Sequence, residues 1–269
     1  MIKNSENENS LFEARIFGLL KKAEKYEVGV SAFLTPKEQI MAESIIAQAR
    51  SEAFTFFFGG YEGGERKRLY ALPEYMAVEE ALGTKSILEN YSEQILDTVT
   101  AVAIKGSGYK KLTHRDYLGS LLGLGIERDV VGDIAVLDDC SAVVFCDKKI
   151  AEYLLLELKK IGSDTVKVKT WELSPEFKYE KAFAPISDTV ASPRFDCVVS
   201  ALCGISREKA QRIIHVGEAE LDYFVEERSD RSVNEGSIIS VRGYGKFSVV
   251  KLSEQTKKGR LRLLANKYI

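Results

Sequence analysis

The stretch Ser192-Pro-Arg-Phe-Asp196 opens the segment that decides the fold of the C-terminal part of the chain, and Arg242-Gly-Tyr-Gly-Lys-Phe247 closes it. Apolar residues follow Pro193 at helical spacing, which predicts a short helix that begins at this proline and ends at Gly204. A second helix is expected from Ser206, a residue type that favours the N-cap, to the glycine at position 217. The segment therefore begins with two short helices.

Strands are expected after the second helix. Residues 219–225 alternate in the manner of a strand, and an apolar run at 238–241 follows the turn Asn234-Glu-Gly236. The segment therefore predicts a small α+β domain in which two helices pack on a sheet.

Basic and polar side chains share one side of the second helix and the nearby turn Gly243-Tyr-Gly245. The Arg207 guanidinium and the free amide groups of the helix start can converge on one phosphate, and replacing Arg207 and Arg212 is expected to change stability little. An internal pair between Arg194 and Asp196 is an almost equally good interpretation of Arg194. The candidate site residues in this segment are Arg194, Ser206, Arg207, Lys209, Gln211, Arg212, His215, Arg242, Tyr244 and Lys246.

The order of residues 192 to 252 resembles the S-four RNA-binding domain, named from the fourth protein of the small ribosomal subunit. In that family the second helix and the loop beside it hold RNA, so the resemblance implies RNA binding on this side. Two positions depart from the family pattern: Asp222 stands where Asn is usual, and Ser237 where Asp is common. The matching residues are Arg194, Asp196, Ser206, Arg207, Ala210, Ile214, Gly217, Val233, Gly236, Val241 and Arg242.

Charge is distributed unevenly along the chain of 269 residues, whose net charge is −2. From Arg194 to the end there are 14 Lys and Arg against 10 Asp and Glu, whereas the preceding residues carry 24 against 30. The overall charge argues against a general nucleic-acid binder, but the C-terminal excess fits a local phosphate-binding surface.

The four cysteines show no CxxC spacing and no histidine nearby, so buried thiols in a reducing cytosol are expected rather than a metal site. No apolar run reaches the ~18 residues that a membrane span needs, and the polar N-terminus is unlike a signal peptide. We therefore expect a cytoplasmic protein without a cofactor or metal.

The N-terminal part predicts a frayed tail, a helix from Leu11 to Glu24, and a second helix after the capping box Thr35-Pro-Lys-Glu38. Strands are expected at 54–58 and 68–72. The glycine-rich loop between them lacks the following helix and Lys-Ser/Thr of a nucleotide-binding loop. A plain hairpin loop and an RNA contact remain equally good interpretations, the contact residues being Tyr61, Arg66 and Arg68.

Residues 97–171 predict the order βαββαβ, the ferredoxin-like motif that many RNA-binding domains use. The expected elements are strands at 97–105, 133–137, 141–146 and 166–170, with helices at 114–122 and 148–161. This order predicts one four-stranded antiparallel sheet backed by two helices.

The letters His114-Arg115-Asp116 also occur in the kinase catalytic loop, but the partner motifs of a kinase are absent. We prefer a reciprocal cap between Thr113 and Asp116, with His114 and Arg115 facing solvent or RNA.

The motifs Phe57-Phe-Gly-Gly-Tyr-Glu-Gly63, Thr113-His-Arg-Asp-Tyr-Leu-Gly-Ser-Leu-Leu-Gly-Leu-Gly-Ile126 and Gly132-Asp-Ile134, with the C-terminal module, resemble the YlmH-type proteins over nearly the whole chain. The resemblance implies binding of ribosomal RNA, association with the large ribosomal subunit, rescue of stalled translation, and a link to bacterial cell division.

Two function classes remain open from the sequence. The first is a non-catalytic factor that binds ribosomal RNA or tRNA on the ribosome, with cell-division proteins as further partners. The second is an RNA-modifying enzyme or a relative of the tRNA synthetases that docks its substrate through the S-four domain, although the sequence shows no catalytic constellation. A division-scaffold protein is a third class, for which the sequence shows no self-associating surface. The expected organisation is an N-terminal α/β segment at 1–92, a ferredoxin-like domain at 93–173, a linker at 174–191, and an S-four-like domain at 192–269.

Overall fold

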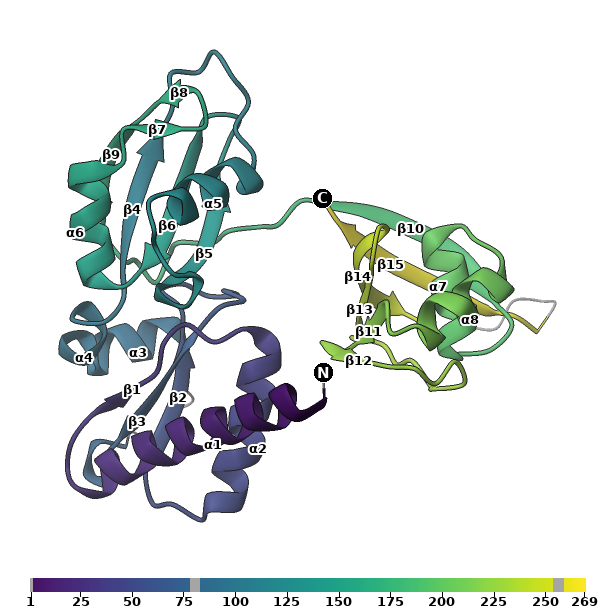
Figure 1. Cartoon of the computed structure of the whole chain (residues 1–269), viewed down its shortest axis with the longest axis horizontal. Helices are drawn as coiled ribbons and strands as arrows, with labels where there is room; N and C mark the ends of the chain where they lie inside the picture. Colours follow the sequence, from purple (N-terminus) through teal and green to yellow (C-terminus); the bar gives the residue numbers. More distant parts are fainter. Residues whose placement is uncertain (1, 78–82, 254–258) are drawn as a thin grey trace. The chain divides into compact units, whose positions relative to one another are not determined.

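The computed structural model describes residues 2–77, 83–253 and 259–269. The chain forms two compact units, Met1–Tyr179 and Glu180–Ile269. Both units combine helices with antiparallel sheets, which confirms the α+β class (Figure 1). The N-terminal segment and the ferredoxin-like domain lie in the same unit.

The N-terminal part of the first unit packs two helices on a three-stranded sheet of order β1-β3-β2. The first helix begins at Ile2, so the frayed tail expected before Leu11 was wrong for residues 2–10. The capping box is confirmed, because the Glu38 carboxylate accepts hydrogen bonds from both the amide and the hydroxyl of Thr35. The elements are α1 (Ile2–Glu24), β1 (Gly29–Val30), α2 (Pro36–Ala49), β2 (Phe54–Phe58), β3 (Arg68–Leu72), α3 (Thr84–Asn90) and α4 (Ser92–Leu96).

The rest of the first unit has the predicted ferredoxin-like topology, with a four-stranded antiparallel sheet of order β5-β6-β4-β9. Alternate residues of these strands pack against α5 and α6 on one face. The elements are β4 (Thr100–Lys105), α5 (His114–Gly123), β5 (Val131–Val136), β6 (Ser141–Cys146), α6 (Lys148–Glu157), β7 (Lys160–Ile161), β8 (Asp164–Thr165) and β9 (Lys167–Trp171). The expected helix to Ile161 was too long, because β7 and β8 form a hairpin around Gly162.

The second face of this sheet is covered at one end. Tyr61, from the loop after β2, stacks on Phe145 with a centroid distance of 4.7 Å, and Phe177 contacts both rings. These rings bury Ala101, Ala135 and other small side chains of the sheet. Bases therefore cannot stack on this end of the sheet.

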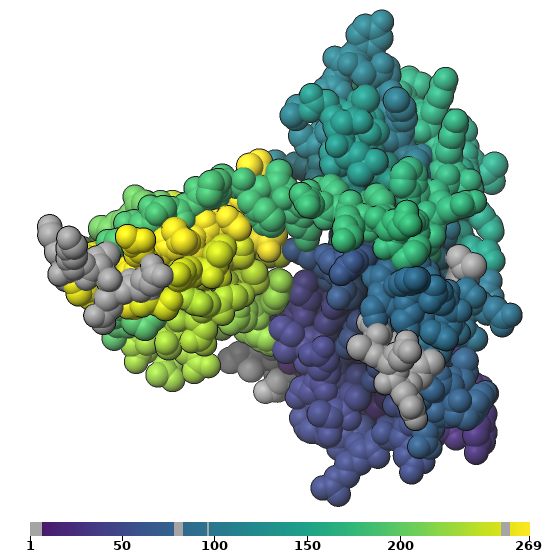
Figure 2. Space-filling view, turned by 180° about the vertical axis from the view of Figure 1, so that it is seen from behind, coloured from purple at the N-terminus to yellow at the C-terminus, as the bar shows by residue number. Residues whose placement is uncertain are grey.

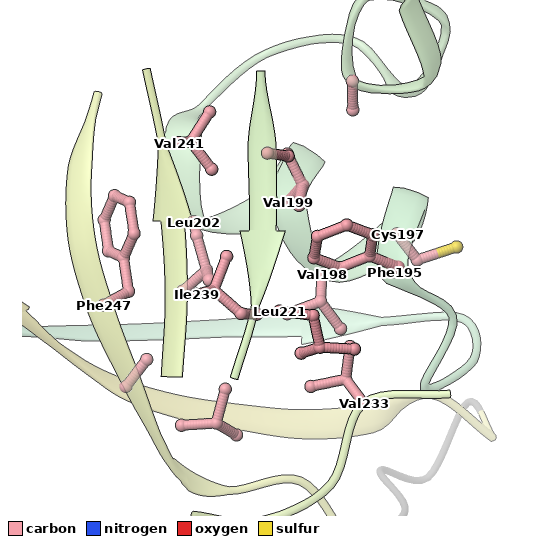
Figure 3. Close-up of a cluster of buried hydrophobic side chains, with 14 of the residues drawn as sticks. Phe195, Cys197, Val198, Val199, Leu202, Leu221, Val233, Ile239, Val241 and Phe247 are labelled. Atoms are coloured by element: carbon pink, nitrogen blue, oxygen red, sulfur yellow. The ribbon is translucent and has the colours of Figure 1, made fainter. Parts of the chain in front are cut away.

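The C-terminal unit packs α7 and α8 on one face of a six-stranded sheet of order β10-β15-β14-β13-β11-β12. Figure 3 shows the core between them, where Phe195, Val198 and Leu202 of α7 meet Ile239 and other strand residues. The elements are β10 (Phe183–Val190), α7 (Phe195–Cys203), α8 (Arg207–His215), β11 (Ala219–Leu221), β12 (Phe224–Val225), β13 (Ile238–Val241), β14 (Gly245–Lys251) and β15 (Leu261–Tyr268).

Three expectations for this unit were wrong. Residues 183–190 are not a linker, because β10 pairs with β15 along its whole length. Helix α7 begins at Phe195 with Arg194 as N-cap rather than at Pro193, since the Phe195 amide donates to the Arg231 carbonyl. Residues 219–225 are a tight hairpin rather than one strand, and its turn residues Asp222 and Tyr223 both have positive φ angles.

Candidate RNA-binding surfaces

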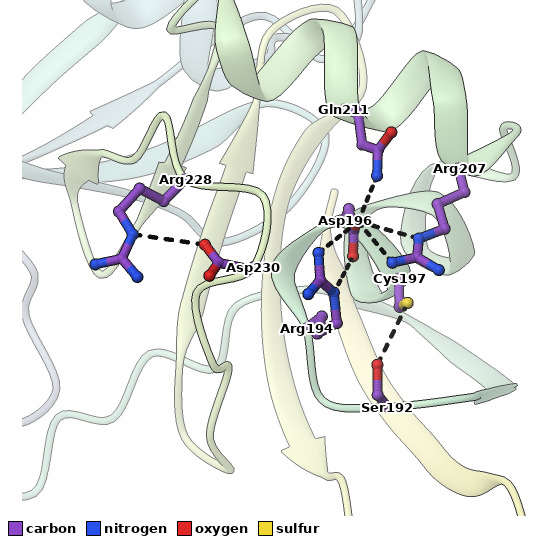
Figure 4. A network of polar contacts seen from close by, with 8 residues as sticks. All are labelled: Ser192, Arg194, Asp196, Cys197, Arg207, Gln211, Arg228 and Asp230. Carbon is purple, nitrogen blue, oxygen red and sulfur yellow. Dashed lines mark hydrogen bonds and ion pairs between the residues drawn. The ribbon is translucent and has the colours of Figure 1, made fainter.

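Three of the candidate residues on the helical side of the C-terminal unit converge on one buried carboxylate. The Asp196 side chain is fully buried at the start of α7. Arg207 donates to Asp196 Oδ2 from Nε and Nη2, at 3.0 and 2.9 Å, and Gln211 Nε2 donates to the same oxygen at 2.7 Å. Arg194 donates to both Asp196 oxygens (Figure 4).

This network determines the protonation state of Asp196. Burial alone would raise the pKa of the carboxyl, but the hydrogen bonds from Arg194, Gln211 and Arg207 outweigh burial and hold the pKa well below its usual range. Asp196 is therefore a permanent anion at neutral pH, and a buried anion needs its cationic partners.

The expectation that Arg207 can be replaced at little cost in stability did not take its contact with Asp196 into account. Its guanidinium lies at the helix start as predicted, but it neutralises Asp196, and its side chain is only half exposed. The internal interpretation of Arg194 is confirmed by its ion pair with the same carboxylate. Gln211, Arg194 and Arg207 thus join α7 to α8.

The other helical candidates lie at the surface, where most contact neighbouring side chains. Lys209 Nζ lies 5.7 Å from the centroid of the Tyr244 ring, and His215 is exposed. Arg212 pairs with Glu208 on the same helix. Arg242 approaches Glu218 at 3.4 Å. Ser206 caps α8 by accepting from the Lys209 amide.

Lys246 does not share this side of the unit. Ser240 pairs with Lys246 in the register of β13 and β14, whereas the neighbouring pair Ile239 and Phe247 points into the core under the helices. Because successive strand residues point to opposite faces, Lys246 lies on the sheet face away from α7 and α8.

The candidates in the glycine-rich loop are structural. Tyr61 is 2% exposed and donates from its hydroxyl to Asp133 at 2.8 Å, while burial and the Asp133 charge raise its pKa. The Arg66 guanidinium donates to three backbone carbonyls. Arg68 is 6% exposed and pairs with Asp147 at 2.9 Å. An RNA contact by these residues was the wrong alternative, because they join the glycine-rich loop and β3 to the ferredoxin-like sheet.

His114 and Arg115 are exposed at the start of α5. The Asp116 carboxylate accepts from the amide and hydroxyl of Thr113, at 2.8 and 2.7 Å. The capping interpretation of this motif is therefore confirmed.

One basic surface was missed from the sequence. Lys105 of β4 pairs in register with Lys167 of β9, and Lys169 lies two residues further along the same face. All three side chains are exposed at the end of the sheet that Tyr61 leaves uncovered. No ion pair holds any of them within the described residues. We call these three residues the lysine end; the alternation Lys167-Val168-Lys169 was the signal that could have revealed it.

The loop at residues 106–112 adds an aromatic side chain beside the lysine end. Gly106 is required at its base, since a Cβ there would lie 2.5 Å from Asp164 Oδ2. The Ser107 amide and hydroxyl both donate to Asp164. Tyr109 at the loop tip is 98% exposed, next to Lys110. A fixed loop thus presents a ring and a cation to solvent.

Within the described residues, no cluster of three or more His, Cys, Asp or Glu could hold a metal ion. No helix in the described ranges has the length and apolar character needed to cross a membrane. The four cysteines are free thiols.

Comparison with known proteins identifies an RNA-binding domain in the first unit. The family model described as "Putative RNA-binding domain in YlmH" matches residues 93–175, which contain the lysine end. The ribosome-associated protein quality control protein P2 of Bacillus subtilis (strain 168) is 30% identical over 241 residues, which cover 89% of this chain and 87% of that protein. The cell division protein ylmH from Streptococcus pneumoniae has a similar fold, with a TM-score of 0.50, 20% identity, and coverage of 64% of this chain and 95% of that chain.

The fold and the matched domain define an α+β protein with an RNA-binding domain, homologous to a ribosome-associated quality control protein. The chain belongs to the YlmH family.

Proposed function

We propose that this chain is a non-catalytic RNA-binding factor that acts on the ribosome, contacts ribosomal RNA of the large subunit, and serves the quality control of stalled translation. The name of the Bacillus subtilis relative supports the ribosomal setting. Contact with tRNA on the ribosome and a link to cell division, the latter suggested by the name of the Streptococcus pneumoniae protein, are the finer parts of this proposal.

The observation that carries the proposal is the lysine end within the matched RNA-binding domain. The three lysines are adjacent and exposed, and none has a carboxylate partner in the described part of the chain. Their ammonium groups therefore repel one another, and bound phosphates would remove this repulsion. By contrast, Arg194, Arg207, Arg212 and Arg242 of the C-terminal unit each contact a carboxylate. Lysine ammonium groups can bind phosphates without reading a base.

The test replaces Lys105, Lys167 and Lys169 together by Gln. If each contacts one phosphate, the slope of log K against log salt should become less steep by roughly 2 to 3, and the protein should leave the ribosomal fractions of a gradient at lower salt. A control with the same charge change replaces Lys21, Lys22 and Lys25, which are exposed near the end of α1. Equal slopes for the lysine-end variant and the wild type would contradict the proposal.

A further inference from the structure

The sheet of the C-terminal unit has one face without helices. Side chains of β10, β15 and β14 alternate between the core under α7 and α8 and this opposite face. Figure 2 shows the unit from behind, with β15 (yellow) at the surface. We call this the open sheet face; it carries Phe183, Tyr223, Lys246, Ser248, Lys251, Arg262, Leu264, Asn266 and Tyr268.

Aromatic rings and cations alternate across the open sheet face. Lys246 Nζ lies 4.7 Å from the centroid of the Tyr268 ring and 5.1 Å from that of Tyr223. Phe183 meets Tyr268 edge to face at a centroid distance of 4.9 Å. Lys181 Nζ also approaches the Tyr268 ring, 5.9 Å from its centroid. The three rings come from three different segments of the unit, so the sheet itself sets their spacing.

The charge of this face favours a polyanion. Three cations, Lys246, Lys251 and Arg262, lie on its strands, and Glu220 is the one carboxylate among the described strand residues of the face. An apolar protein partner would bury the charges of these cations away from water, which is costly. A phosphate backbone would instead pair with them.

The three rings, of which Phe183 is exposed and Tyr223 and Tyr268 are half-buried, favour unpaired bases over a duplex. Phe183 is 41% exposed although it is apolar, and Leu264, which lies opposite Ser187 on the same face, is 37% exposed. Aromatic side chains on a sheet stack on splayed-out bases, and cations between them hold the backbone. The Ser248 and Asn266 side chains, which are cross-strand neighbours, offer hydrogen-bonding groups between the rings.

We propose that the open sheet face binds unpaired RNA, with bases stacked on Tyr268 and Phe183 and phosphates held by Lys246 and Arg262. This inference rests on the proposed RNA-binding function and deepens it by naming the form of RNA. The site is distinct from the helical side of the same unit and from the lysine end.

The test measures affinity of the full chain for a single-stranded polyuridine RNA of about 12 nucleotides and for an RNA duplex of the same length. Tyr268→Leu, which keeps apolar bulk, and Lys246→Gln should each weaken binding of the single strand about tenfold and change duplex binding less than twofold. Lys267→Gln is the matched control, because Lys267 lies on the same strand but pairs with Phe247 on the helix-covered face. Circular dichroism and the melting temperature check that each variant is folded.

The outcomes separate this inference from the proposed function. Equal single-strand affinity for Tyr268→Leu, Lys246→Gln and the wild type would overturn the open-face site while leaving RNA binding intact. A wild-type chain that binds neither RNA would overturn both. Loss of a co-purifying protein with unchanged RNA affinity would assign the face to a protein partner and overturn the inference. A selective loss of single-strand binding in both variants, with Lys267→Gln unaffected, supports it.

Discussion

Asp196 shows how one buried carboxylate changes the role of the arginines around it. A charged side chain with no exposure is tolerated only when it is paired. Two guanidinium groups and one amide provide that pairing, so they act first on the packing of α7 against α8. Basic residues on a predicted RNA-binding helix are therefore not all available to RNA.

Arg207→Ala should lower the free energy of unfolding of the C-terminal unit by about 1–2 kcal/mol, because it leaves the buried Asp196 with fewer donors. The matched change is Arg212→Ala, which removes an exposed pair with Glu208 and should cost under ~0.5 kcal/mol. The free energy of unfolding of each variant is measured by urea titration, in which hydrogen exchange of peptides from residues 195–215 reports on the C-terminal unit. Equal stability of the two variants would show that the network contributes little.

Residue identity and local spacing predicted the caps at Thr35, Thr113 and Ser206 correctly, since a cap depends on neighbours within a few positions. The same reasoning could not place the Asp196 side chain, whose partners Arg207 and Gln211 are 11 and 15 residues further along the chain. Tertiary packing decides whether a charged side chain is buried, and tertiary packing cannot be deduced from local sequence patterns.

The two departures from the S-four pattern contact each other. Ser237 Oγ donates to Asp222 at 3.3 Å, and the Asp222 carboxylate also accepts from the Ile238 amide at 2.8 Å. An Asp at 237 would place a second carboxylate against the first. The two changes are therefore compatible as a pair.

At the scale of elements, β10 is the largest part of the fold that the sequence did not reveal. Its apolar pattern is interrupted by Pro185 and by polar residues, and half of its residues are exposed. Proline is tolerated there because β10 is an edge strand, which needs hydrogen bonds on one side only. Its partner β15 is 71 or more residues away in the chain, beyond the reach of local periodicity.

We expect residues 180–269 to fold on their own, and residues 192–269 to be less stable by about 3 kcal/mol or more. The shorter fragment loses the buried Val190 side chain and leaves β15 as an unpaired edge. A fragment that begins at residue 174 is the control and should match 180–269 in its urea midpoint. Equal midpoints for 180–269 and 192–269 would show that β10 is dispensable.

The ferredoxin-like part was the most predictable, because its strands and helices differ clearly in period and succeed one another with short connections. The glycine-rich loop was the least predictable part of the candidate site. Its glycine-rich, charged composition suggests an exposed loop, but Tyr61 is buried. The contacts that bury it come from Asp133 and Phe145, which are more than 70 residues further along the chain.

At the scale of the whole molecule, basic surface lies in both compact units. Residues 180–269 carry 15 Lys and Arg against 12 Asp and Glu. The first unit is acidic overall, yet it contains the lysine end. Net charge alone would therefore assign RNA binding to one unit, whereas the placement of charges predicts it for both.

Each unit alone, residues 1–179 and 180–269, should bind RNA with a smaller salt slope than the full chain, and the two slopes should add to roughly that of the full chain. The reason is that each phosphate contact contributes about 0.7–0.9 to the slope wherever it lies. The full chain should bind RNA more tightly than either unit alone, because once one unit is bound, binding of the second unit is intramolecular. A full slope in one unit alone would refute a divided surface.

The backbone conformation of Tyr223 costs stability, and the Tyr223 side chain contributes to the open sheet face. Its φ angle of 71° lies in the left-handed region, where a side chain of this size costs about 1 kcal/mol, and glycine is the residue that such a two-residue turn favours. Selection for a robust fold alone would put glycine there, yet the chain keeps a phenol ring beside Lys246. Tyr223→Gly should therefore raise the free energy of unfolding and lower the affinity for single-stranded RNA. Such an opposition between stability and activity is expected where a strained residue serves binding.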